Sequence, residues 1–442
     1  MAKAILGDIS IDHQQDMDYV SEHMTAVIMG PGCGEGSLSI RSIEEICKTL
    51  PNLEWVGIPV SWFIDSLDIS SAKIKPGSEK RRDEIKEDSW LVSSYDRNNA
   101  HAIARKNSYD PSTIRYGGTM PDEEVLKFVN ALKEQGKKVA FYPFLMVDNE
   151  SKDWRGYITG SAEQVEMFYT NQYQPFVMHY AFLLRDKVDM FYIGSELEGL
   201  TVIKGEERNF PFVNNLCGLA ANVRSIVGEK VQISYAANWS EYLHCKGGYR
   251  PLDTLWSDQN INFVGIDYYM PLTDVDNQQI TLESIKNGFT SSEGWDYFYQ
   301  DSTQIIIDQD YNRWKNIGYW QSSDHWAWDS EKGESYKTSW IPNSKPIIFS
   351  EFGFRSIEMA TNTPNVYGSS LPKHSNGSTD FPLQIKAIRA TLEHISENPA
   401  IQTGFCYVWD ARGYGWQNSY VDGHQWAQGH WIDGKLQILQ TK

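Results

Sequence analysis

Two glutamates stand at the ends of short apolar runs, and their repeated arrangement points to chemistry. Glu196 follows the run Met190–Ser195, and Glu351 follows the run 346–350. A carboxylate at the C-terminal end of a barrel strand lies where (β/α)8 enzymes keep their active sites. Glycoside hydrolysis needs two such groups, one protonated to release the leaving group and one ionised to attack or stabilise the anomeric carbon. The pair therefore favours a sugar-cleaving enzyme, whereas a surface or helix-capping role would suit either glutamate alone.

Other polar and aromatic residues follow the ends of further strand-like runs and are candidates for binding a sugar. A ring such as that of Trp409 could form the floor of a sugar subsite, because flat aromatic faces suit the C–H faces of pyranoses. A tyrosine near Glu351 could hydrogen-bond its carboxylate and hold it ionised. Structural packing would explain each of these residues equally well. The candidates are Asp148, Trp154, Arg155, Asn238, Trp239, Tyr268, Tyr269, Trp409 and Asp410.

Other chemistries find little support in the motifs. The glycine-rich run 30–36 has Glu35 where a dinucleotide fingerprint requires glycine, and it lacks the Lys-Ser/Thr pair of a phosphate-binding loop. The sequence contains no HExxH or comparable histidine cluster and no GxSxG elbow. A nucleophilic cysteine paired with a histidine is left as an alternative, although no motif in the sequence supports one. We expect neither a cofactor nor a metal.

Composition excludes several classes of protein. The 442 residues carry a net charge of −18, which argues against nucleic acid as a partner because phosphate contacts need clustered Lys and Arg. The five cysteines lack CxxC spacing, so a disulfide framework or a zinc knuckle is not indicated. The N-terminal residues lack the apolar core of a signal peptide, and no apolar stretch approaches the roughly 20 residues of a membrane span. We therefore expect that the protein has no signal peptide of its own and does not insert into a membrane.

Eight strand-like runs alternate with helix-period segments, which is typical of parallel βαβ units. The clearest unit has a helix that begins at Pro121 and stops at Gly136, followed at once by a strand. Side chains alternate along a strand, so Gly194 should share a side with Glu196, and Phe349 with Glu351. The pattern predicts an α/β fold, a closed (β/α)8 TIM barrel. The predicted strands are 27–30, 55–62, 139–145, 190–196, 231–237, 263–269, 346–351 and 404–409.

The chain is longer than a minimal barrel, which needs about 250 residues. The surplus predicts long inserted loops at about 63–120, 270–345 and 355–382, and a Trp-rich C-terminal tail at 410–442. These segments follow strands, so they should lie on the C-terminal face of the barrel, where the active site is expected. We interpret residues 1–442 as a single elaborated TIM-barrel domain.

Several strand-end motifs are similar to those of known proteins. The motifs are Trp154-Arg155-Gly156 and the segments 193–197, 234–239, 265–272, 345–353, 294–297, 363–366, 408–412 and 429–431. They resemble the TIM-barrel domain of gene transfer agent tail proteins and, more distantly, the clan A β-mannanases of glycoside hydrolase family 113. The first resemblance is the fuller one and covers nearly everything after about residue 53.

The likeness to the enzymes implies a retaining mechanism, with Glu196 as acid/base and Glu351 as nucleophile. Most clan A enzymes carry Asn directly before the acid/base, to grip the sugar 2-hydroxyl, whereas this chain has Ser195. The mannanase-like branch also lacks that Asn, so the departure weakens the inference of substrate more than that of activity.

The likeness to tail proteins implies a module of a larger phage-like tail or baseplate protein that opens cell-envelope glycan. Its partners would be a polysaccharide or oligosaccharide and other tail proteins. Such a protein would be made in the bacterial cytoplasm and would act in the tail of the particle at the cell envelope. The alternative is a non-catalytic barrel that binds glycan or serves as a structural part of the tail, and the long inserts would suit assembly contacts.

Overall fold

A computed structural model describes most of the chain. The described residues are 11–30, 40–78, 90–103, 118–149, 153–243, 248–276, 280–291, 315–366 and 370–410. The predicted Trp-rich tail, except for its first residue, lies outside them, as do parts of the predicted inserts.

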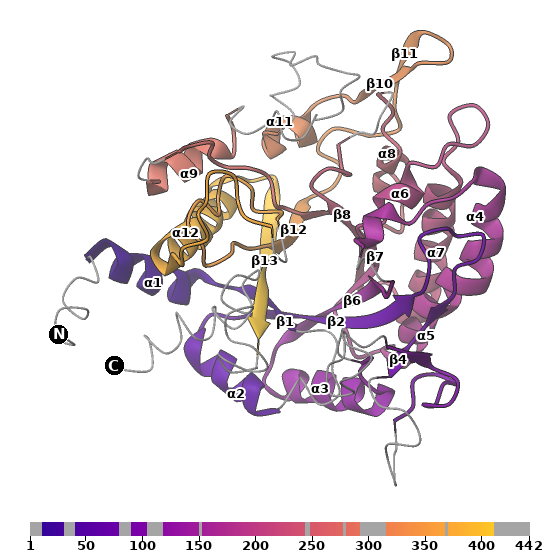
Figure 1. The fold of residues 1–442 in the computed structure, drawn as a ribbon, viewed down its shortest axis with the longest axis horizontal. Coiled ribbons are helices and arrows are strands. Elements are labelled where there is room, and N and C mark those ends of the chain that lie inside the picture. Colours follow the sequence, from indigo (N-terminus) through magenta and orange to yellow (C-terminus); the bar gives the residue numbers. More distant parts are fainter. Residues whose placement is uncertain are drawn as a thin grey trace.

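Eight parallel strands close into a barrel, as the sequence predicts. Each strand pairs in parallel with its neighbours, and the pairing of β1 with both β13 and β2 closes the ring. Figure 1 looks along this ring, with the helices outside it. The barrel strands are β1 (Ala26–Gly30), β2 (Trp55–Ile64), β6 (Lys138–Val147), β7 (Met190–Ser195), β8 (Gln232–Asn238), β9 (Val264–Asp267), β12 (Ile347–Phe352) and β13 (Ile401–Asp410).

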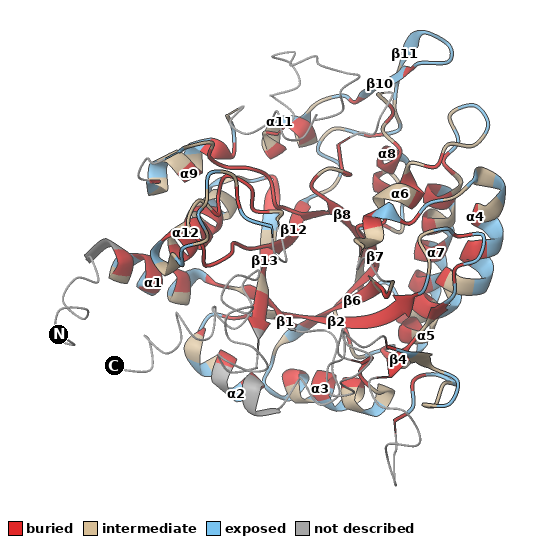
Figure 2. Ribbon diagram, viewed as in Figure 1, coloured by how far each residue is buried: buried red, intermediate tan, exposed pale blue. Residues whose placement is uncertain are grey.

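Helices surround the barrel, and α4, for example, turns an exposed side outward in Figure 2. The predicted helix end is seen at Gly136, and another helix ends at Gly228; their φ angles of 71° and 85° suit glycine. The helices are α1 (Ile11–His23), α2 (Ile40–Thr49), α3 (Asp122–Glu134), α4 (Ala162–Phe168), α5 (Gln174–Leu183), α6 (Glu198–Thr201), α7 (Pro211–Val227), α8 (Leu252–Trp256) and α12 (Phe381–Glu397). A π-helical turn, η3 (Tyr169–Tyr173), joins α4 to α5.

The inside of the barrel is filled by its own cluster of side chains, separate from the larger core between strands and helices. Tyr142 of β6 and Tyr192 of β7 stack there with ring centroids 4.2 Å apart, and Phe405 of β13 meets Tyr142 edge-on at 5.9 Å. All three are fully buried. This packed floor leaves the strand ends above it as the place for a site.

The predicted inserts carry short elements of their own. After β2 come β3 (Ile74–Lys75), β4 (Gly77–Ser78) and β5 (His101–Ala102). After β9 come α9 (Leu282–Gly288), α11 (Ile317–Ser322) and the antiparallel pair β10 (Trp326–Asp329) and β11 (Glu334–Lys337). Each insert leaves the C-terminal end of a barrel strand, as expected. No helix in the described part of the chain is long and apolar enough to cross a membrane.

Candidate active site

Glu196 and Glu351 lie at the C-terminal ends of two barrel strands and are both nearly covered. Glu196 directly follows β7, and Glu351 is the fifth residue of β12. Their exposed fractions are 7% and 3%. The two groups share one site, because Arg155 contacts both Glu196 and Ser195, Ser195 bonds Asp267, and Asp267 pairs in register with Glu351. Strand ends on different sectors of the ring have therefore brought the predicted pair together.

The predicted alternation of side chains is wrong at both glutamates, because it breaks just before each of them. The pairing of β7 with β8 shifts register between Tyr192 and Ser195, and that of β12 with β9 shifts between Phe349 and Glu351. As a result, a Cβ on Gly194 would meet Tyr173 on the helix side of the strand, and Phe349 stacks on Tyr268 at 4.3 Å. Such bulges redirect a side chain and are common beside active sites.

Glu196 also departs from ordinary strand geometry. Its φ of 51° is in the left-handed region, which a non-glycine residue adopts at a cost of roughly 1–3 kcal/mol. Its N–H donates to the carbonyl of Ala236 at 2.8 Å, which holds the strained backbone in place. The strain accompanies a side chain that turns into the site, as expected where structure serves function.

Three predicted binding residues converge on the carboxylate of Glu196. The indole Nε1 of Trp154 donates to Oε2 at 2.8 Å, and Nδ2 of Asn238 donates to Oε1 at 2.9 Å. Nη2 of Arg155 lies 2.8 Å from Oε2. Its guanidinium also lies 4.9 Å from the ring centroid of Phe144. Three donors, one of them a cation, therefore hold the Glu196 side chain in place at the strand end.

Glu351 has a poorer set of partners. The hydroxyl of Tyr269 donates to Oε2 at 2.8 Å, whereas Oε1 has no hydrogen-bond partner among the described residues. Burial raises the pKa of Glu351, and the nearby charge of Glu196 raises it further. The Arg155 charge and the Tyr269 hydroxyl lower this pKa in part. Tyr269 and Arg155 are therefore the two groups that favour the ionised form of Glu351.

A third carboxyl group, Asp267 at the end of β9, was missed by the sequence analysis. It is fully buried, and its partners are Ser350 Oγ at 2.7 Å and Ser195 Oγ at 3.3 Å. The rule that singled out Glu196 and Glu351, a carboxylate ending an apolar strand, would have found it. The residues predicted at this strand end were instead the two that follow, Tyr268 and Tyr269.

Some predicted binding residues take other positions. Tyr268 lies on the helix side of β9, where its ring stacks on Phe349, so its predicted role in binding sugar is wrong. Trp409 is 1% exposed within the outer core, so its ring offers no face as the floor of a subsite. Trp239 is also buried in that core. The side chain of Asp410 lies outside the description, although its backbone pairs with β1.

Asp148, the remaining candidate, is bound to an insert and not to the glutamates. Its carboxylate lies 2.7 Å from Nε2 of His101 in β5. The pair anchors the segment after β2 to the end of β6. This agrees with the structural alternative to sugar binding for Asp148.

A partly exposed aromatic pair lies beside Glu196. The ring of Trp154 meets that of Tyr157 edge-on, with centroids 5.4 Å apart, and Tyr157 is 60% exposed. Both belong to the loop after β6, which forms the short 3-10 turn η2 (Arg155–Tyr157). Exposed aromatic rings next to buried polar groups suit a pyranose face. Tyr157 was not among the predicted residues, although it lies only two residues after Arg155.

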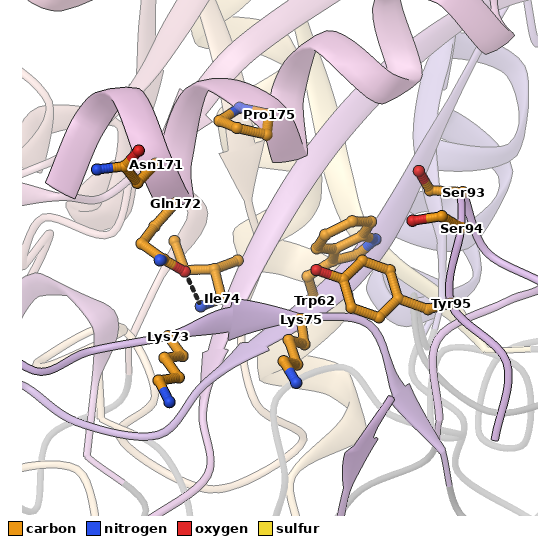
Figure 3. A pocket seen from close by; sticks show the side chains of 10 residues that line it. All are labelled: Trp62, Lys73, Ile74, Lys75, Ser93, Ser94, Tyr95, Asn171, Gln172 and Pro175. Atoms are coloured by element: carbon orange, nitrogen blue, oxygen red, sulfur yellow. Dashed lines mark hydrogen bonds between the residues drawn. The ribbon is translucent and has the colours of Figure 1, made fainter. Parts of the chain in front are cut away.

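A cavity of about 280 Å³ lies elsewhere on the molecule (Figure 3). Trp62 of β2, Lys75 of β3, Tyr95 and Gln172 of the π-helical turn are among its lining residues. Gln172 Oε1 accepts from the N–H of Ile74 at 3.0 Å across it. Neither Glu196 nor Glu351 lines this cavity, so it is separate from the candidate site.

Comparisons with known proteins agree with this architecture. Residues 89–212 match glycoside hydrolase family 113, and a search of curated proteins finds no significant match. A solved GH113 β-1,4-mannanase shares 13% identity over 95% of this chain and 98% of its own, with a TM-score of 0.52. The GH113 β-mannanase AaManA from Alicyclobacillus acidocaldarius, in complex with ManMIm, shares 13% over 94% of this chain and 95% of its own, with a TM-score of 0.54.

These structural likenesses, at 13% identity, show that the chain shares its fold with the two mannanases. The fuller match is to a different description, GTA TIM-barrel-like domain, over residues 171–416. That range is more than half of the 442 residues and includes β7 to β13 with both glutamates. The chain therefore belongs to the GTA TIM-barrel-like domain family.

Proposed function

We propose that this protein is a retaining, endo-acting glycoside hydrolase that cleaves a bacterial cell-envelope or related polysaccharide as part of a phage-like tail or baseplate. The observation that carries the proposal is the pairing of Glu196 and Glu351 at strand ends, with Trp154, Arg155 and Asn238 on one and Tyr269 on the other. The fold alone would support many functions, whereas this arrangement fits glycosidic bond cleavage.

The proposed reaction proceeds in two displacements. Glu351 attacks the anomeric carbon while Glu196 donates its proton to the glycosidic oxygen, so the bond to the leaving sugar breaks as a glycosyl ester forms. Glu196 then removes a proton from water, whose oxygen attacks the same carbon and releases Glu351. The partly exposed Trp154 and Tyr157 would stack against a sugar ring beside the cleaved bond.

The first step requires a proton on Glu196 and a charge on Glu351. Burial raises the pKa of Glu351, whereas the Tyr269 hydroxyl and the charge of Arg155 lower it and so favour the charged form that the step requires. Trp154, Arg155 and Asn238 contact the Glu196 carboxyl. The indole and guanidinium groups would also donate to the hydroxyls of a bound sugar, which accept hydrogen bonds.

The test is release of oligosaccharide from defined polymers. The purified protein is incubated with peptidoglycan, mannans and other bacterial surface polysaccharides, and products are separated by mass and length. We expect internal cleavage by the wild type and loss of turnover in Glu351→Gln. Glu393→Gln is the control, because Glu393 lies on the outer helix α12 and pairs with Lys286 of α9 and Arg389 of α12. Equal rates for wild type and Glu351→Gln would sink the proposal.

Two further measurements address the mechanism and the setting. A 2-deoxy-2-fluoro glycoside of the cleaved sugar should leave a covalent adduct on the peptide containing Glu351, and an adduct on Glu196 would reverse the proposed roles. An anomer of inverted configuration among the first products would exclude retention. Mass spectrometry of purified phage-like particles from producing cells tests the proposed place in a tail, which rests on the family match.

A second candidate is a non-catalytic barrel that binds glycan or serves as a structural part of the tail. One observation favours it. Both glutamates are nearly covered, and within the described ranges Trp239, Tyr268 and Trp409 are buried and do not line an open groove around them. Binding of a polysaccharide without any release of products, unchanged in Glu351→Gln, would support this candidate over the enzyme.

A further inference from the structure

Asp267 is a third carboxyl group in the candidate site, and the two-glutamate mechanism does not use it. It ends β9 at the register position paired with Glu351 of β12. Its side chain is fully buried, and its hydrogen-bond partners are the hydroxyls of Ser350 and Ser195. No cation in the described part of the chain lies within ion-pair distance of it. A buried carboxyl held only by hydroxyls is unusual enough to require a reason.

The two hydroxyls connect Asp267 to both glutamates. Ser195 Oγ also accepts from Nη2 of Arg155 at 2.8 Å, and the same nitrogen lies 2.8 Å from Oε2 of Glu196. Nε of Arg155 donates to the carbonyl of Ser195 at 2.9 Å, which fixes the plane of the guanidinium. On the other side, Ser350 directly precedes Glu351.

We propose that Asp267 is a positioning residue, which through Ser195 holds Arg155 on Glu196 and through Ser350 holds the strand end that carries Glu351. The inference rests on the proposed hydrolase function. It also gives Ser195 a role. In place of the Asn expected to contact sugar, this chain has a short hydroxyl that links the guanidinium to the buried acid.

The charges in the site determine the form in which Asp267 acts. Glu196, Glu351 and Asp267 are three buried carboxyl groups beside a single guanidinium, so they cannot all ionise at low cost. Burial first, and then the charges of Glu351 and Glu196, raise the pKa of Asp267 well above the ordinary value, which favours its protonated form. The hydroxyls of Ser195 and Ser350 donate to its two carboxyl oxygens. The titratable and charged groups that face it are Glu351 of β12, Glu196 after β7, Arg155 of the β6 loop, Tyr142 of β6, Tyr192 of β7 and Tyr269 after β9.

Two variants separate positioning from simple loss of structure. Asp267→Asn has the shape and donor of the protonated acid, whereas Asp267→Ala removes both links. We expect Asp267→Ala to lower turnover by about 100-fold, the effect of a small misplacement of reacting groups, and Asp267→Asn by less than about tenfold. The acidic limb of the pH–rate profile should stay in place in Asp267→Asn. If Asp267 were ionised, removal of its charge would move the acidic limb of the profile to lower pH, by about one unit.

The control is Asp253→Asn, another buried carboxyl, which is bound to His325 and Thr338 of the insert after β9. It should lower the unfolding temperature without altering the pH profile. Equal turnover in Asp267→Ala and Asp267→Asn would overturn the positioning role. So would a downward shift of the acidic limb in Asp267→Asn.

A measurement without substrate keeps this inference separate from the proposed function. Urea unfolding of wild type and Asp267→Asn is followed between about pH 5 and about pH 7, where a protonated Asp267 in the folded state adds about one proton relative to the unfolded chain. We expect the free energy of unfolding of Asp267→Asn to fall less steeply with rising pH than that of the wild type. The two slopes should differ by the equivalent of about one bound proton. An unchanged slope would overturn the protonated state. If wild type cleaves no polymer, the proposed function fails, and this slope still decides the state of Asp267.

Discussion

Replacement of Tyr269 by Phe is the sharpest test of how this site controls ionisation. The Tyr269 hydroxyl is the one hydrogen-bond donor that the described residues give to the Glu351 carboxyl, at 2.8 Å from Oε2. This bond stabilises the ionised form of Glu351 and lowers its pKa against the effect of burial. Tyr269→Phe should therefore raise the pKa of Glu351 and make the nucleophile harder to ionise.

The size of the effect follows from the geometry. A hydrogen bond to a charged group contributes about 1.5–3 kcal/mol, and one pKa unit corresponds to about 1.4 kcal/mol. Loss of the Tyr269 bond should therefore raise the pKa of Glu351 by about 1–2 units. On the acidic limb, where activity is proportional to ionised Glu351, kcat/KM should fall about 10-fold to 100-fold. The deficit should shrink as pH rises, because more of the Glu351 carboxyl then ionises in the variant.

The assay is the pH profile of kcat/KM on whichever polysaccharide the wild type cleaves. Tyr180→Phe is the matched control, because Tyr180 is also fully buried and its hydroxyl makes one bond, to Trp62 at 2.9 Å on the helix side of the barrel. It should lower stability to a similar extent and leave the profile in place. A loss in Tyr269→Phe that is the same at every pH would refute the reasoning, as would a limb that moves toward lower pH.

Three further predictions use other parts of the chain. Trp154→Phe keeps the ring but removes the N–H that bonds Glu196, so turnover should fall at least about tenfold in the same assay, whereas an unchanged rate would exclude this contact from catalysis. Burial raises the pKa of Glu241 to about 8. The stability that this group contributes is therefore complete below about pH 4.5 and is lost as the pH rises to about 8. Urea unfolding of Glu241→Gln should show a pH slope smaller by about 1.4 kcal/mol per unit in that window, and an equal slope would contradict this. Gly218→Ala, at an exposed position of α7 where a Cβ meets nothing within 4 Å, should raise the free energy of unfolding by up to about 1 kcal/mol, whereas a lower unfolding temperature would show a missed contact.

Local pattern was sufficient for the elements of the barrel. All eight predicted strands are present within a few residues of their predicted bounds, because each is an apolar run between helices that stop at residues such as Gly136 and Gly228. Glu196 and Glu351 were found by the same local signal, a carboxylate directly after such a run. Trp154, Arg155 and Asn238 were also selected by their places at or after strand ends, and their contacts with Glu196 lie on the face where parallel strand ends meet.

The sequence by itself therefore determined the order of the strands, the closed α/β barrel and the positions of two glutamates along the chain, because these depend on periodicity and on residue types. Only the tertiary structure decided which side chains enter the site. Register shifts before Glu196 and Glu351 break the alternation of side chains, and they arise from pairing with neighbouring strands, which no local pattern records. The same holds for Asp267, whose importance comes from burial next to both glutamates and from hydroxyls of two distant strands.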